Sequence, residues 1–197
     1  MTHILAIAAS PTHPSRTYGL VKYVTEVLQQ QDCHTDIIAV HDFLAKALTY
    51  SQYPYNQYPN LALDQFRAIL NKADGVIIAT PLFKAAYRRL QTFLDLLPQK
   101  AFDGKVLLPI ATEGSTDTKW AIDYALIPLL SELKARQILS GVYTVNRQIQ
   151  FQADGSVQVD EATRRRLKYC LQRLVESANI NISTDKLCLK PLTTISY

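Results

Sequence analysis

Residues 3–24 read HILAIAASPTHPSRTYGLVKYV and contain three successive patterns. Residues 3–9 are apolar and either small or branched, which is typical of a buried strand. From residue 17 onward the apolar positions recur at helical spacing, on Leu20, Val24, Val27 and Leu28. The segment between them carries four hydroxyls and one fixed positive charge, on Ser10, Thr12, Ser15, Thr17 and Arg16. The chain therefore opens as a strand, a polar loop and a helix.

The same alternation continues along the chain. Further apolar strands are predicted at residues 34–40, 74–80, 105–112 and near 137–145. Helical patterns cover residues 17–31, 61–73, about 88–97, about 118–134 and about 160–178. Alternating strands and helices with nearly continuous apolar strands indicate a parallel sheet that is covered on both faces. We therefore predict an α/β fold, a flavodoxin-like doubly wound five-stranded parallel sheet with helices on both faces.

The length of 197 residues suits one domain, which we place at residues 1–180, with a C-terminal tail at 181–197. Residues 148–159 alternate around an Asp-Gly pair, which predicts either a small hairpin or an irregular excursion after the fifth strand. Residues 50–60 contain four tyrosines and have no clear pattern.

Composition excludes several classes of protein. Hydrophobic residues make up 48% and charged residues 19%, and the net charge is only +4. No apolar run is long enough for a membrane span, and the N-terminal residues lack the basic segment, apolar core and cleavage site of a signal peptide, so we expect a cytoplasmic protein without a membrane partner. The three cysteines and four histidines lack metal-ligand spacing. The basic run at 164–169 fits a solvated helix face, so nucleic acid is not an expected partner.

The hydroxyl-rich loop has two possible roles. It either caps the following helix or binds an anion, because a helix N-terminus offers unpaired N–H groups and the positive end of a dipole. The loop contains neither GxGxxG nor GxxxxGK[ST], which disfavours dinucleotide sites and P-loops. A mononucleotide phosphate remains, and FMN is the natural ligand for such a sheet.

Several segments carry a resemblance to a known family. They are ASPTHPSRTYGLV (9–21), ADGVIIATPLFKAAY (73–87), LDLLPQKAFDGKVLLPIAT (94–112), AIDYALIPLLSELKA (121–135) and ILSGVY (138–143). Together they resemble the NAD(P)H-dependent FMN reductases, above all those that supply reduced flavin to alkanesulfonate monooxygenases.

The resemblance implies a set of FMN-binding residues. The phosphate and ribityl chain are assigned to Ser10, Ser15, Arg16, Thr17 and Tyr18. The flavin ring is assigned to two loops, with Pro81, Leu82, Phe83 and Lys84 in one and Thr112, Glu113, Gly114 and Ser115 in the other. Without the family, Pro81 and Phe83 would equally suit a tight turn with a core aromatic.

The chain departs from the family pattern at three places. Ala9 replaces a glycine, Glu113 stands where the family has another glycine, and Arg88 and Arg89 follow Tyr87 where a Tyr-Ser-Gly sequence is usual. The segment after Tyr87 is also one residue shorter. Tyr124 matches an inserted tyrosine that in the family produces a π-bulge at a tetramer interface; the alternative is an ordinary helix tyrosine.

The resemblance implies that the protein transfers a hydride from NADPH or NADH to FMN, and that reduced FMN leaves for a partner monooxygenase. It implies a homo-oligomer, either a dimer or a tetramer, and no catalytic side chain, because the two cofactors supply the chemistry. Two alternatives stay open. One is a flavoprotein that keeps FMN bound and reduces quinones, azo dyes or metal oxyanions, and the other is a flavodoxin-like binding protein with little turnover.

Overall fold

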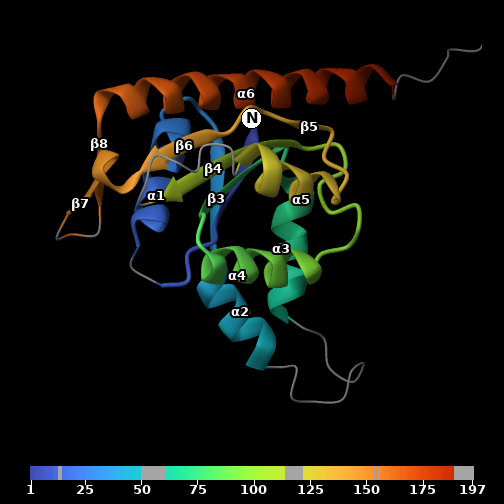
Figure 1. The fold of residues 1–197 in the computed structure, drawn as a ribbon. Coiled ribbons are helices and arrows are strands. Elements are labelled where there is room, and N and C mark those ends of the chain that lie inside the picture. The colour runs from blue at the N-terminus through green and yellow to red at the C-terminus, as the bar shows by residue number, and fades with distance from the viewer. Residues whose placement is uncertain (13–14, 50–60, 114–121, 153, 155, 189–197) are drawn as a thin grey trace, which may run out of the picture.

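The structure is a computed structural model that describes residues 1–12, 15–49, 61–113, 122–152, 154 and 156–188 (Figure 1). One parallel sheet forms its centre, in the order β2-β1-β3-β4-β5, with β6 also paired to β4. The strands are β1 (His3–Ala8), β2 (His34–Ala39), β3 (Gly75–Pro81), β4 (Val106–Glu113), β5 (Gln137–Ile138) and β6 (Val142–Val145). This is the flavodoxin-like order, so the predicted fold class is confirmed.

The fifth strand position is interrupted, which the sequence analysis did not foresee. Leu107 pairs with Ile138 and Ile110 pairs with Val142, so the outer strand advances four residues while β4 advances three. Pro109 lies opposite this bulge and has no N–H to donate, which is why a bulge suits it. A Cβ on Gly141 would lie only 2.7 Å from the Ile122 Cγ2, so the packing of Ile122 leaves no room for a side chain there.

Helices cover both faces of the sheet. On one face, α1 (Arg16–Gln29) and α6 (Glu161–Cys188) pack against the side chains of Ile4, Ala6 and Ile77. The other face is covered by α2 (Val40–Thr49), α3 (Leu61–Lys72), α4 (Lys84–Asp95), the π-helix η3 (Ile122–Leu126) and α5 (Ile127–Ser131). Figure 1 shows α6 crossing the sheet on the side opposite α2 and α4.

Three aromatic rings join the helices of the second face. Phe43, Phe66 and Phe93 come from α2, α3 and α4, and their ring centroids lie 5.2–5.4 Å apart. Two of the three pairs are edge-to-face, the arrangement that aromatic pairs favour. This cluster fixes α2, a helix that the sequence analysis missed, directly after β2.

The other differences concern the ends of elements. α6 continues to Cys188, ten residues beyond the predicted end, and so enters the segment expected to be a tail. The predicted hairpin is confirmed as β7 (Ile149–Phe151) paired antiparallel with β8 (Val157–Val159). Residues 50–60 lie outside the described residues. Among the described helices, none combines the length and apolar character that crossing a membrane requires.

Candidate flavin site

The loop between β1 and α1, residues 9–15, lies at the carboxyl edge of the sheet, where ligands of such folds bind. Ser10 is buried, and its Oγ accepts a hydrogen bond of 3.4 Å from the Thr12 N–H. Ser15 caps α1, because its Oγ accepts a hydrogen bond of 3.1 Å from the Tyr18 N–H. The loop therefore presents one buried hydroxyl beside a capped helix N-terminus.

This helix end has the properties of an anion site. The α1 dipole places positive potential at its first turn, and the first turn contains no acidic side chain. Arg16 is exposed there and makes no ion pair within the described part of the chain. The hydrogen-bond donors and the positive charge fit a phosphate group, so these residues are chemically suited to the phosphate end of FMN.

A buried hydroxyl pair joins this helix to β4. The Oγ1 atoms of Thr17 and Thr112 lie 2.8 Å apart, and both residues are almost fully buried. Two of the predicted site residues, which lie 95 positions apart in the sequence, are thus in contact. Their hydroxyls bind each other, and this contact fixes α1 against the end of β4.

The second predicted loop follows β3. Pro81 ends the strand, and the Leu82 N–H donates to the carbonyl oxygen of Thr112 at 3.2 Å. Phe83 has an extended backbone at the N-cap of α4, and its side chain is 46% exposed. Phe83 is therefore not a core aromatic. Lys84 is the first residue of α4.

The third predicted loop begins at the end of β4. Glu113 is the last residue of that strand, next to Thr112. Gly114 and Ser115 lie outside the described residues. The structure thus brings the ends of β1, β3 and β4 together at one edge of the sheet.

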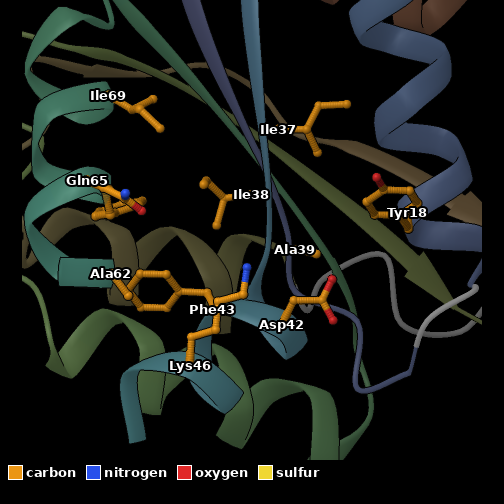
Figure 2. A pocket seen from close by; sticks show the side chains of 11 residues that line it. Tyr18, Ile37, Ile38, Ala39, Asp42, Phe43, Lys46, Ala62, Gln65 and Ile69 are labelled. Carbon is orange, nitrogen blue, oxygen red and sulfur yellow. The ribbon is translucent and has the colours of Figure 1, made fainter. Parts of the chain in front are cut away.

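A separate cavity of about 260 Å³ lies along the outer strand β2 (Figure 2). Ile37 and Ile38 point to opposite sides of the strand there, and Asp42 and Lys46 supply charges at its rim. Tyr18 is the one predicted site residue that lines this cavity. The cavity is therefore distinct from the junction of the loops after β1, β3 and β4.

The described residues include the thiols of Cys33 and Cys170 and several side chains of the types that bind metals. Burial raises the pKa of the Cys33 thiol and that of the Cys170 thiol, which keeps both protonated near neutral pH. No group of three or more potential metal ligands occurs in the part of the chain that was described. The ends of β1, β3 and β4 offer hydrogen-bond donors, the positive charge of Arg16 and the exposed ring of Phe83.

Comparisons with known proteins agree with this geometry. The family model described as NADPH-dependent FMN reductase matches residues 2–150. The chain belongs to this family.

Its relatives include two proteins named FMN reductase (NADPH). The one from Escherichia coli K12 is 42% identical over 147 residues, covering 74% of each chain. The one from Pseudomonas putida KT2440 is 35% identical over 174 residues, covering 86% of this chain and 84% of the relative. The predicted family and enzyme class, an FMN reductase, are confirmed.

Solved structures support the fold. The apo crystal structure of an NADH:FMN oxidoreductase superposes with a TM-score of 0.71 at 31% identity, covering 88% of each chain. Flavodoxin 1 from Bacillus cereus, at 16% identity, superposes with a TM-score of 0.53 over 90% of this chain and 98% of that one.

The π-helix expected from the family resemblance is present in this FMN reductase. η3 spans Ile122–Leu126 and contains Tyr124, whose side chain is 77% exposed. The Tyr87 hydroxyl, on α4, donates to the carbonyl oxygen of Ala125 at 3.4 Å, which connects the two helices. Tyr124 is thus not an ordinary helix tyrosine packed on the sheet.

Proposed function

We propose that this FMN reductase binds FMN with its phosphate at the N-terminus of α1 and its ring between the loops after β3 and β4. The observation that carries this placement is the capped, acid-free first turn of α1 with exposed Arg16 beside buried Ser10. Ser15 and the first-turn N–H groups complete the donors to the phosphate. Tyr18 follows them on the ribityl side.

The remaining predicted residues would position the ring. Pro81, Leu82, Phe83 and Lys84 lie at one edge of it in this proposal, and Thr112, Glu113, Gly114 and Ser115 at the other. FMN, when bound, accepts a hydride from NADPH or NADH, so the protein need not provide an acid, a base or a nucleophile. The exposed Phe83 ring offers apolar surface for stacking, and the Thr17–Thr112 contact keeps the phosphate and ring ends at a fixed separation.

We further propose that FMN is a substrate that leaves after reduction and supplies a partner monooxygenase. Two departures from the family pattern support this reading. Glycines that allow close backbone approach to a ring are absent at Glu113 and after Tyr87, so the phosphate should carry most of the affinity. A tightly retained flavin would instead favour the alternative in which bound FMN reduces an external acceptor.

The direct test compares FMN with riboflavin, which lacks the phosphate. Arg16→Ala should weaken FMN binding about tenfold and leave riboflavin binding nearly unchanged, because a charge-assisted hydrogen bond is lost. Arg67→Ala, an exposed arginine on α3 that pairs with Asp64, is the charge-matched control. Equal losses for both ligands would remove the phosphate from this loop.

The activity itself is measured by NADPH and NADH oxidation with and without added FMN. Colourless purified protein that oxidises either nucleotide only when FMN is added supports the substrate reading. Yellow protein with retained flavin supports the bound-flavin alternative, and flavin-free protein without turnover supports the binding-protein alternative.

We also propose that the enzyme forms a homodimer or homotetramer through the groove between α4 and η3–α5. This groove of about 680 Å³ is lined by Tyr87, Arg88, Tyr124, Pro128 and Leu129, among others. π-Bulges occur frequently at functional sites, and Tyr124 is exposed on one here. A cytoplasmic location, where NADPH and reduced thiols occur, agrees with the unpaired Cys33 and Cys170.

A further inference from the structure

Arg89 connects segments that follow three neighbouring strands. It lies on α4, after β3, and its Nη1 lies 3.2 Å from the carbonyl oxygen of Pro11 in the β1–α1 loop. The same Nη1 lies 2.7 Å from Nδ1 of His41. His41 belongs to the first turn of α2, directly after β2. One guanidinium therefore holds the β1–α1 loop, α2 and α4 together.

The hydrogens of this contact can be assigned from chemistry. A guanidinium nitrogen of the Nη type carries two hydrogens and accepts none. One hydrogen is donated to the Pro11 oxygen and the other to His41 Nδ1, so Nδ1 must be the acceptor. The His41 proton then lies on Nε2, and the ring is neutral while the contact exists. A second proton on His41 would place N–H against N–H and one positive charge against another.

The neighbouring arginine has a different environment. Arg88 is exposed and lines the groove between α4 and η3, whereas Arg89 is half-buried and turned toward the sheet edge. The unusual Arg88–Arg89 pair therefore does not act as one charged patch. Only Arg89 reaches the loop that precedes α1.

Other charges around His41 are few. Arg89 is the charged group that contacts its ring, and Asp42, the next residue on α2, lines the cavity in Figure 2. Within the described residues, no charged group of β2 or of the β1–α1 loop forms a hydrogen bond with the His41 ring. The contact with Arg89 therefore requires a neutral His41 ring.

We propose that Arg89 is a positioning residue for the phosphate end of the site, and that it holds the β1–α1 loop only while His41 is neutral. By fixing the carbonyl of Pro11, Arg89 fixes the adjacent buried Ser10 in the conformation that receives the phosphate. This inference rests on the proposed placement of the FMN phosphate at this loop. It gives a role to an arginine that stands where the family pattern has a small residue.

The first test separates positioning from general charge. Arg89→Ala should weaken FMN binding roughly tenfold, raise KM for FMN and leave kcat at saturating FMN unchanged, while riboflavin binding changes by less than about twofold. Arg89→Lys should restore part of the FMN affinity, because an ammonium can still donate to both acceptors. Arg67→Ala again controls for loss of one positive charge. An FMN loss no larger than that of Arg67→Ala overturns the proposal.

Folding and tautomer are read without activity. Thermal unfolding establishes that each variant is folded. If Arg89→Ala is not folded, His41→Ala removes the second hydrogen bond of Arg89 Nη1, which orients the guanidinium toward Pro11, and should weaken FMN binding selectively. In the ligand-free protein, ¹⁵N chemical shifts of His41 should report the Nε2-protonated tautomer at neutral pH. The Nδ1-protonated tautomer would contradict the assignment.

The second test is a pH profile of FMN affinity. His41→Asn keeps an acceptor near the position of Nδ1 but does not titrate. As the pH falls from neutral, wild-type affinity should fall more steeply than that of His41→Asn, because a protonated His41 ring cannot accept a hydrogen bond from Arg89. Protonation of the FMN phosphate is common to both proteins and cancels in the comparison. Parallel profiles would overturn the role of His41.

The outcome for Arg16→Ala distinguishes the two levels of inference. If Arg16→Ala loses FMN selectively and Arg89→Ala does not, the phosphate site stands and the positioning role fails. If neither variant separates FMN from riboflavin, the phosphate is not at this loop.

Discussion

At the scale of single residues, the site depends on polar atoms that are buried and paired. Thr17 and Thr112 are nearly fully buried, and each hydroxyl has the other as its partner. The sequence analysis placed both residues at the site from a family resemblance, but nothing in the residue pattern showed that they touch. Contacts between residues so distant in sequence depend on which strands are neighbours in the sheet. Local residue patterns do not show the order of the strands.

The hydroxyl pair gives a stability prediction. Thr112→Val keeps the shape of the side chain but leaves the Thr17 hydroxyl buried without its partner, which should cost about 1–3 kcal/mol in the free energy of unfolding. Thr17→Val should cost a similar amount. The double variant should lose clearly less than the sum, because neither buried hydroxyl is then left alone. Denaturant unfolding measures all three, and strictly additive losses would mean that the two hydroxyls do not depend on each other.

Glu113 gives a prediction about the two redox states of FMN. If the carboxylate faces the ring, it destabilises the reduced anion, so Glu113→Gly should raise affinity for reduced FMN by about tenfold, and more than for oxidised FMN. Glu113→Gln keeps the size and removes the charge, and should produce most of the same gain. Anaerobic titrations with each redox form provide the measurement. Equal gains for the two forms would show that Glu113 points away from the ring.

At the scale of elements, the sequence predicted the parts that local patterns determine. Local sequence patterns predicted five elements, with ends correct to within two residues. Continuous apolar runs indicated β1, β3 and β4, and apolar positions at helical spacing indicated α1 and α3. The helix α2 was missed because the rings that bury its Phe43, those of Phe66 and Phe93, come from other helices. The break between β5 and β6 was missed because it depends on Pro109 in the neighbouring strand.

The N-terminus of α6 gives a pH-dependent prediction. The Thr163 N–H donates to Asp160 Oδ1 at 2.8 Å, and Gln148 Nε2 donates to Oδ2 at 3.2 Å. The hydrogen bonds from Thr163, and then that from Gln148, lower the pKa of the Asp160 carboxyl below its usual value. Because the folded pKa is the lower one, this stabilisation is present above the unfolded pKa, near 3.9, and is lost as the pH falls through the folded pKa.

Asp160→Ala should therefore reduce the free energy of unfolding by about 1 kcal/mol at neutral pH, the usual effect of losing an N-cap. The difference between wild type and variant should narrow as the pH falls below about 4. Urea unfolding at several pH values measures it, with Asp103→Ala, at an exposed carboxylate before β4, as the control. A difference that stays constant down to the lowest pH would mean that the charge of Asp160 does not contribute.

At the scale of the whole molecule, the two faces of the sheet differ in what they leave exposed. α6 lies across one face of the sheet (Figure 1). On the other face, α4 and η3–α5 leave a groove between them. Tyr124 projects from this groove at the π-helix, and Arg88, Asp95 and Glu132 surround it with charges of both signs. A surface with charges of both signs can contact a second copy of itself, because in a two-fold contact the same patch lies on both subunits.

This surface gives the last prediction. Tyr124→Asp adds a negative charge beside Asp95 and Glu132 and removes an exposed ring, so an interface centred on Tyr124 should weaken by 2 kcal/mol or more, as expected for loss of an aromatic anchor. The wild-type protein should sediment as a dimer or tetramer at micromolar concentration, and the variant as a smaller species. Tyr169→Asp makes the same change at a tyrosine that is 65% exposed on α6, and it should sediment like the wild type. A monomeric wild type would contradict self-association, and an unchanged Tyr124→Asp oligomer would place the interface elsewhere.

The groove and the β1–α1 loop lie on different sides of α4. Dissociation caused by Tyr124→Asp should therefore leave the preference for FMN over riboflavin intact, which separates assembly from phosphate binding.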